Sequence, residues 1–455
     1  MEHESGPGVG VDAVATRTRR DGRLRRVLII SRYFPPLYDV GGKRAYRFAM
    51  HLPDHGWQPI ILTGAVPAGY PADPTPLRLP PGVEIVRDYA PRWWPHRRNR
   101  AADGTIPEPV VARGGGRVRR WLRAQARIPL RRDVLLTPRT ALWARRLIRS
   151  TPIDLVFATG PPWGVLLQGL AASRVAGAPL CLDLRDPWTP GFLHRGMVRW
   201  VRSVERRTEA YLLQRAERVI LSSEDAAAAY RQCYPSLAPQ HFTVIRNSVD
   251  PAMRPPAQPR ATPPTIVHFG NCYGPRTLTP ALRAIAALRR RASTDGLRLL
   301  NLGRIGESDL RLAERLGVRD CLEYRPMLPY AEGLRALASA DLQLLLGYGT
   351  ETGYVPAKFY DYCLSGRPIL CIARRSELTR LVDDTGRGRC ADPDDIEAIA
   401  DAIGAAISDA CAIARGPADA AERARYAAPD TTAQLARAFD DVADARSRAR
   451  RPPPL

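Results

Sequence analysis

The chain has 455 residues, 45% of them hydrophobic, and a formal net charge of +22. This length exceeds what one hydrophobic core organises, so we expect two domains of about 200 residues each. The apolar content excludes a largely disordered chain, and the charge indicates either an anionic partner or a coding bias that enriches arginine throughout.

The first elements predict a strand–helix–strand unit. Residues 26–31 form a short apolar run typical of a buried parallel strand, and a Pro-containing loop leads to the pair Gly41-Gly42. The next segment has apolar residues at helical spacing, and residues 56–63 form the following strand. Such a unit opens a doubly wound α/β fold.

Two further blocks of strands follow an irregular stretch. From about residue 65 to 132 the periodicity is lost, which predicts a long insertion. Regular strands return at 153–158, 179–184, 218–223 and 242–247, and a second set lies at 265–270, 297–303, 322–324, 342–346 and 368–372. We therefore predict a disordered tail (1–25), a first domain (26–250), a Pro-rich linker (251–264), a second domain (265–428), a terminal helix (429–445) and a tail (446–455).

Only two of the 68 basic residues are lysines, Lys43 and Lys358. An ammonium differs from a guanidinium fork at a crowded anion site, so these two lysines mark positions where arginine is not equivalent. Each lies at a predicted strand-to-helix junction, where backbone N–H groups and the helix dipole favour phosphate. The pattern predicts phosphate contacts there, although two lysines left at random by coding bias would look the same.

No targeting or membrane-spanning segment is expected. Residues 1–26 contain no apolar run of the kind a signal peptide needs, and no run reaches the roughly 20 apolar residues that span a bilayer. The eight cysteines have neither paired nor metal-ligand spacing, which is typical of buried thiols in a reducing compartment. We expect a cytoplasmic protein, or one attached to the inner face of the membrane.

Four segments, residues 34–42, 183–188, 244–250 and 341–368, match motifs of one family in the expected order. They resemble the retaining glycosyltransferases of family 4, whose GT-B fold consists of two doubly wound, Rossmann-like domains facing across a cleft. The resemblance runs from about residue 26 to 442 and is poor between 65 and 132. It implies that the first domain binds the acceptor and the second binds a nucleotide-sugar donor.

Within that resemblance, Lys358 and Arg276 are the expected catalytic cations. Arg276 stands where the family usually has lysine, and Asn271 stands where it usually has arginine, so one of two usual cations is absent. Cations and a helix N-terminus in a water-poor cleft stabilise a leaving diphosphate as its charge grows in the transition state. No metal and no cofactor are therefore expected, because the nucleotide sugar is itself a substrate.

The resemblance also places the ribose and the sugar. Asp361 stands where the second glutamate of the family's donor motif accepts hydrogen bonds from the ribose hydroxyls, whereas the first glutamate of that motif would fall at Gly353 and is absent. The loop 347–355 is the expected sugar-contacting segment. The other residues expected at the donor are Gly270, Asn271, Gly303, Arg304 and Pro356.

On the acceptor side, Gly41 and Gly42 permit close approach of the backbone to a phosphate or a reacting sugar, and Lys43 is expected to face the cleft. The alternative is a tight turn followed by a solvated lysine. Asp186 is expected to orient the acceptor hydroxyl and Arg185 to contact donor phosphate, both as catalytic residues. An internal ion pair between them is the alternative.

Other features are read as structural. Glu205 and Glu209 are expected to be structural residues, and His268, inside an apolar strand, is expected to be a packed core residue. The basic segment 117–128 is either a helix that rests on anionic lipid or a solvated insertion.

These observations predict a metal-independent, retaining glycosyltransferase acting on a glycan or polyprenyl-linked acceptor in bacterial surface polysaccharide or glycolipid synthesis. A non-catalytic GT-B partner subunit and a GT-B-fold sugar epimerase remain alternatives. A basic nucleic-acid-binding protein is less favoured, and no nucleic acid is expected as a partner, because the aromatic residues are not interleaved with the charges.

Overall fold

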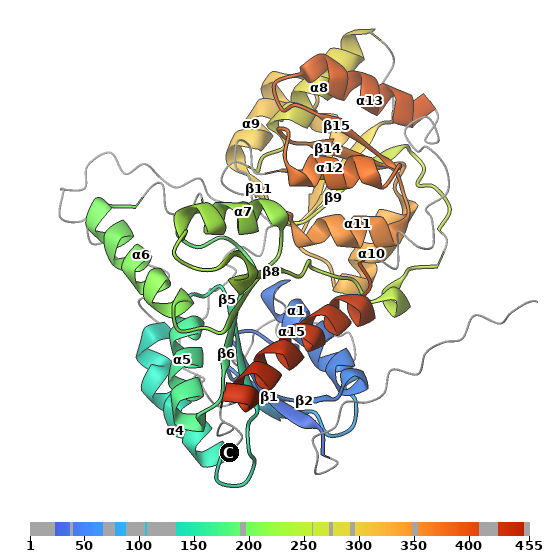
Figure 1. Ribbon diagram of the computed structural model, residues 1–455. Helices are drawn as coiled ribbons and strands as arrows, with labels where there is room; N and C mark the ends of the chain where they lie inside the picture. The colour runs from blue at the N-terminus through green and yellow to red at the C-terminus, as the bar shows by residue number, and fades with distance from the viewer. Residues whose placement is uncertain are drawn as a thin grey trace, which may run out of the picture.

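The computed structural model describes residues 23–36, 40–66, 78–87, 105–106, 133–191, 197–256, 258–272, 276–291, 296–347, 354–408 and 426–449. Figure 1 shows two α/β lobes, one above the other, with the long carboxyl-terminal helix returning to the lower lobe. The expected pair of doubly wound domains is confirmed.

The amino-terminal domain is built on a parallel sheet with the order β3-β2-β1-β5-β6-β7-β8. Its strands are β1 Arg25–Ser31, β2 Trp57–Thr63, β3 Glu84–Val86, β5 Leu155–Gly160, β6 Leu180–Leu184, β7 Arg218–Leu221 and β8 Phe242–Val244. The helices are α1 Val40–His51, α4 Thr137–Leu147, α5 Gly164–Ala176, α6 Arg199–Leu213 and α7 Glu224–Cys233, with short 3-10 turns at Leu52–His55, Val134–Leu136 and Pro239–His241. Strands β1 and β5 are buried on both faces, as their apolar runs require.

The carboxyl-terminal domain has a second parallel sheet with the order β12-β10-β9-β13-β14-β15. Its strands are β9 Thr265–Phe269, β10 Arg298–Leu302, β12 Leu322–Arg325, β13 Leu342–Leu346, β14 Ile369–Ile372 and β15 Gly388–Ala391. The helices are α8 Thr279–Arg291, α9 Glu307–Arg315, α10 Tyr330–Ser339, α11 Ala357–Ser365, α12 Glu377–Asp384 and α13 Ile396–Ser408, with 3-10 turns at Pro251–Met253 and Arg319–Cys321. A separate two-residue pairing joins β4 (Thr105–Ile106) to β11 (Ile305–Gly306).

The order of strands locates the two places where a ligand is expected. In each parallel sheet, successive strands are added first on one side of the first strand and then on its other side. As a result β1 lies between β2 and β5, and β9 lies between β10 and β13. In doubly wound sheets the loops at the carboxyl ends of such strands leave a crevice for ligands. Helix α1 follows β1, and α11 follows β13, so both lysines belong to helices at these switch points.

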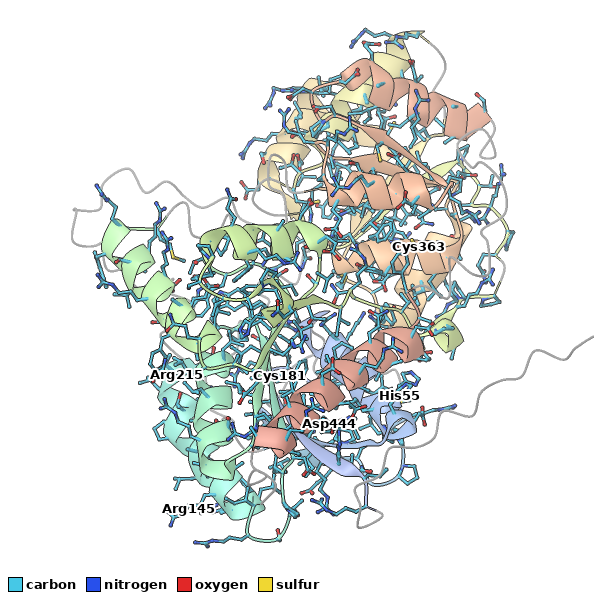
Figure 2. All side chains as sticks on the ribbon, in the orientation of Figure 1. His55, Arg145, Cys181, Arg215, Cys363 and Asp444 are labelled. Carbon is cyan, nitrogen blue, oxygen red and sulfur yellow. The ribbon has the colours of Figure 1, made fainter. Side chains whose placement is uncertain are left out.

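The terminal helix α15 (Ala428–Ala449) packs on the amino-terminal domain beside α1 (Figure 1). The Phe439 ring lies edge-on at 5.3 Å from both Trp57 and Phe157. Arg25 donates to Asp440 and to Asp444, the latter labelled on this helix in Figure 2. The last segment of the chain therefore completes the core of the first domain.

Candidate functional site

Lys358 is the second residue of α11, and Pro356 occupies the N-cap position of this helix. Its Nζ atom is 2.9 Å from Nε2 of His268 on β9. Lys358 thus lies at the amino-terminal end of a helix that follows β13, on the side of the sheet where a ligand is expected. The phosphate-binding role of Lys358 stays a prediction.

His268 is fully buried, as expected for a core residue, but it also has a definite polar role. Its Nδ1 is 2.6 Å from Oδ1 of Asn301, the residue opposite it on β10. The amide nitrogen of Asn301 donates to the Gly303 carbonyl, so its oxygen is the acceptor and His268 Nδ1 is the donor. The lone pair of Nε2 is thus directed at Lys358.

The charges in this region repel one another. Desolvation, together with the nearby charge of Arg276, holds the pKa of Lys358 well below its ordinary 10.5. Burial, reinforced by Lys358 and Arg276, also holds the pKa of His268 well below its usual value, so the ring is neutral. Arg276 itself is buried. A diphosphate placed here would relieve the repulsion between the two cations.

Two glycines pack closely at this site: Gly270 lies against the Lys358 side chain, and Gly303 lies against Gly270. Gly270 has φ +148°, and a Cβ on it would meet Cε of Lys358 at 2.9 Å. Gly303 has φ +140°, and a Cβ there would lie 2.5 Å from the Gly270 carbonyl oxygen. These backbones approach so closely because neither residue carries a side chain.

Asn271 and Arg304 join the loop after β9 to the loop after β10. The Asn271 side chain accepts a hydrogen bond from the Arg304 backbone N–H at 2.9 Å, and the Cys272 N–H donates to the Arg304 carbonyl. The structure therefore gives Asn271 a bracing role, which a cationic arginine could not perform as an acceptor.

Asp361 lies one turn beyond Lys358 and is engaged at the domain boundary. Its Oδ1 accepts from the Tyr330 hydroxyl at 2.6 Å, and Arg47 of the amino-terminal domain donates to the same hydroxyl at 3.1 Å. Lys43 places its Nζ 3.2 Å from the centre of the Tyr330 ring. Lys43 thus reaches the opposite domain, as a cleft-facing residue must, through a cation–π contact.

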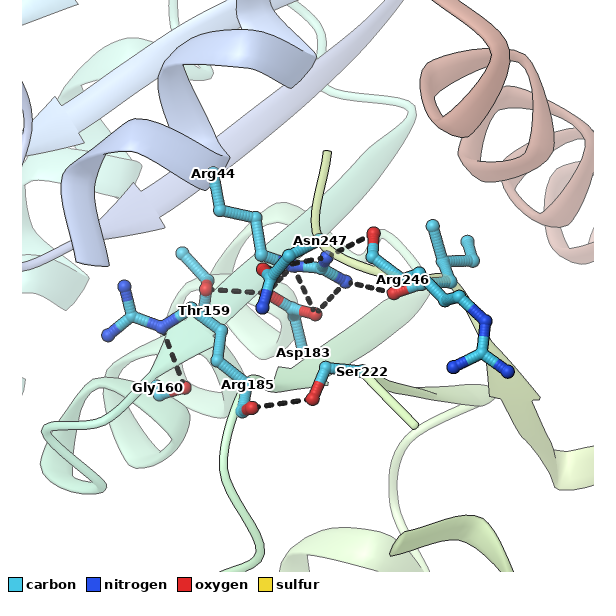
Figure 3. Close-up of polar contacts among 9 residues, drawn as sticks. Arg44, Thr159, Gly160, Asp183, Arg185, Ser222, Arg246 and Asn247 are labelled. Carbon is cyan, nitrogen blue, oxygen red and sulfur yellow. Dashed lines mark hydrogen bonds and ion pairs between the residues drawn. The ribbon is translucent and has the colours of Figure 1, made fainter. Parts of the chain in front are cut away.

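The glycine pair and Arg185 come together at the switch point of the first sheet. The Arg185 guanidinium lies against Gly41, where a Cβ would meet its Cζ at 2.7 Å. Arg185 also donates to the Gly160 carbonyl (Figure 3). It donates to the Pro161 carbonyl as well. Gly42 packs against the backbone of Phe34. Asp186 follows Arg185 on the loop after β6.

A buried ion pair that sequence reasoning missed fastens this region. Arg44 on α1 donates to both carboxylate oxygens of Asp183 at 2.9–3.2 Å, and Thr159 donates to the same carboxylate at 2.6 Å (Figure 3). Arg44 also donates to the carbonyls of Ile245 and Arg246, where the chain leaves the domain. An arginine one residue after Lys43, in a chain rich in arginine, gave no signal of this role.

Two buried glutamates of α6, expected to be structural, bind the loop that carries Asp186. Glu209 accepts from the hydroxyls of Thr189, Tyr230 and Tyr234, and burial raises its pKa. Glu205 accepts from the indole N–H of Trp188 at 3.1 Å. Both glutamates are buried.

Some expected features lie outside the described residues. These are most of the sugar-contacting loop (348–353, including Gly353), most of the insertion, and the basic segment 117–128. Among the residues that the structure does describe, no group of three or more His, Cys, Asp or Glu side chains is arranged to hold a metal ion. No helix in these same ranges is long and apolar enough to cross a membrane.

Known proteins share this architecture. Residues 41–253 match the model of Glycosyltransferase Family 4. Sucrose-phosphate synthase from Thermosynechococcus elongatus superposes with a TM-score of 0.58 at 14% identity, covering 93% of this chain and 98% of that one. An α,α-trehalose 6-phosphate synthase from Burkholderia multivorans gives 0.59 at 13% identity, covering 95% and 100%.

A third solved structure is WaaG, a glycosyltransferase involved in lipopolysaccharide biosynthesis, with a TM-score of 0.53 at 14% identity and coverage of 92% and 99%. A search of curated protein sequences finds no significant match. The two facing domains define the GT-B fold. The chain has that fold, and its residues 41–253 match the model of the family that the sequence resembles.

Proposed function

We propose that the enzyme transfers a sugar, with retention and without a metal, from a nucleotide-sugar donor to a hydroxyl of a glycan or polyprenyl-linked acceptor. The observation that carries this proposal is a pair of neighbouring cations beside the switch point of the second sheet. Lys358 lies at the start of α11, and Arg276 lies on the segment between β9 and α8. Retention follows the family resemblance.

The chemistry assigned to each group is electrostatic. As the bond to the sugar breaks, charge grows on the leaving diphosphate, and Lys358, Arg276 and the N–H groups of α11 stabilise it. Asp361 accepts from the ribose hydroxyls, and the loop carrying Asp186 orients the acceptor hydroxyl. Cations already supply the charge stabilisation that a metal ion provides in other transferases.

We assign the acceptor to bacterial surface polysaccharide or glycolipid synthesis, at the inner face of the membrane. The similar fold of WaaG, which is involved in lipopolysaccharide biosynthesis, supports this assignment. A non-catalytic partner subunit is the second candidate, because Asn271, at the position of a usual cation, is engaged in bracing a loop.

The test is the melting temperature of the protein with uridine, guanosine and thymidine diphosphates. We expect one of them to stabilise it, by about 2.7 kcal/mol at one hundred times its Kd, and Lys358→Met to abolish the shift. If none of the three raises the melting temperature, the donor site is wrong. If one does, the corresponding nucleotide sugar should be consumed, either by transfer to an acceptor or by hydrolysis. A nucleotide sugar that binds but is consumed in neither way would identify a non-catalytic partner subunit.

A further inference from the structure

Helix α6 carries a row of exposed apolar side chains that the glycosyl-transfer site does not use. Trp200 is 47% exposed, Val204 47% and Tyr211 38%. At 100° per residue these three positions lie within about 40° of one another on the helix, whereas Val201 and Glu205 turn to the buried side. Single exposed apolar residues are ordinary, but an aligned row on one helix marks an interaction surface.

A second side of the same helix is basic. Arg199, Arg202 and Arg206 follow helical spacing and border a hollow of about 520 Å³, whose other lining residues are Thr189, Pro190, Ser203 and Cys233. Within the described residues no carboxylate forms an ion pair with these three arginines. The two acids of α6 are engaged on its buried side, as described above. The hollow is therefore suited to an anion.

The neighbouring helices extend this character. On and beside α4, Leu135 is 70% exposed and Leu142 58%. Figure 1 shows α4, α5 and α6 along one flank of the amino-terminal domain, away from the carboxyl-terminal domain. Arg145 and Arg215 both lie along that edge in Figure 2.

We propose that this flank docks on an anionic lipid bilayer, with Trp200 and Val204 in the interface and the arginines of α6 on lipid phosphates. The inference rests on the lipid-linked acceptor of the proposed function. Aromatic, aliphatic and arginine side chains on one amphipathic helix suit the headgroup region, where the arginines are attracted to anionic lipid. Nucleic acid would account for the arginines but not for Val204.

The position of the hollow connects docking with transfer. Thr189 and Pro190, which line it, follow Asp186 by three and four residues on the same loop. A lipid phosphate held by Arg202 and Arg206 would thus lie beside the loop assigned to the acceptor hydroxyl. The bilayer surface then presents the acceptor on the side of the domain where it is needed.

The experiment is co-sedimentation with vesicles of phosphatidylglycerol and phosphatidylcholine, compared with pure phosphatidylcholine, at about physiological ionic strength, where exposed charges are partly screened. The protein should bind the anionic vesicles, and Trp200→Ser with Val204→Ser should weaken binding at least about tenfold. Arg202→Gln with Arg206→Gln should weaken it about tenfold or more. Arg283→Gln with Arg290→Gln on α8 removes the same charge from the other domain and should change little.

Three results would overturn the proposal. The first is no binding of anionic vesicles, and the second is α6 variants that bind them as tightly as the unaltered protein. The third is a melting-temperature shift with inorganic diphosphate that Arg202→Gln with Arg206→Gln removes, while vesicle binding is unchanged. That outcome would make the hollow a site for a soluble anion. Stabilisation by a nucleoside diphosphate, measured on the same variants, reports the donor site separately.

Discussion

Lys358 is poised to take up a proton when its ligand binds. In the free protein, desolvation and Arg276 hold its pKa well below 10.5, so part of the population is neutral between the lowered value and 10.5. A bound diphosphate favours the ammonium and raises this pKa. Binding should therefore take up protons in that window and tighten as pH falls through it.

The measurement is calorimetric titration with the stabilising nucleoside diphosphate in two buffers of different ionisation enthalpy. The observed enthalpy should differ between the buffers in the sense of proton uptake. Lys358→Met should remove most of the difference as well as the affinity. Proton release, or no difference between buffers, would contradict the arrangement of charges described here.

His268 is expected to direct the Lys358 ammonium without touching substrate. A hydrogen bond to a charged group contributes about 1.5–3 kcal/mol, so His268→Leu should weaken nucleoside diphosphate binding by roughly ten- to a hundredfold. His268→Gln keeps an acceptor for the ammonium and should retain more of the affinity. If the two variants bind equally while their melting temperatures agree, His268 is only a packing residue.

At the scale of elements, the sequence predicts most strands because they are buried on both faces and leave continuous apolar runs. It misses β3 and β15, two of the four edge strands of the large sheets, which bury little and carry Glu84 and Arg389. Helix α6 begins at Arg199, earlier than its apolar pattern suggests, because its first turns are largely exposed. The pattern of α15 predicts an apolar face but cannot tell which domain covers it.

The same limit applies to the candidate site. Glycines after strands and a lysine at a helix start are local signals, so Gly270, Gly303 and Lys358 could be predicted to lie together. The sequence around a histidine in an apolar strand is the same whether or not its ring contacts a lysine from another element, so the His268–Lys358 contact could not be predicted. The contacts of Asp361 with Tyr330 and Arg47 depend on how two domains meet, which no local pattern records.

Helix α1 is fastened to its sheet by one buried pair, so its loss should be costly. Arg44→Met leaves the Asp183 carboxylate buried with only Thr159 as a donor among its recorded partners. Breaking a buried pair in this way costs about 3–5 kcal/mol, whereas an exposed pair is worth about 0–1. Urea unfolding should show the larger loss for Arg44→Met and the smaller for Arg289→Gln, which breaks the exposed pair with Asp320. Equal losses would mean that the Arg44–Asp183 pair does not fasten α1.

Over the whole molecule, Glu377 and Asp225 tie the two domains by capping each other's helices. The N–H of Asp225 in α7 donates to Glu377, and the N–H of Glu377 in α12 donates to Asp225, at 2.8 and 2.9 Å. Arg246, on the chain between the domains, pairs with Glu377, and Arg380 pairs with Asp225. Both carboxylates lie at helix N-termini, where negative charge is stabilising.

Glu377→Ala should therefore loosen the contact between the domains while each keeps its own core. It leaves Arg246 without this carboxylate and the Asp225 N–H of α7 without its acceptor across the domain boundary, so the free protein should sample more open arrangements. Small-angle scattering should show a larger radius of gyration for this variant than for Glu307→Ala, which removes the same charge from an exposed side chain of α9. Because the donor and acceptor sides must face each other for transfer, turnover should fall more than affinity for the nucleoside diphosphate. A variant as compact as the control would show that the contacts of Tyr330 with Arg47 and Lys43 suffice to set the arrangement of the domains.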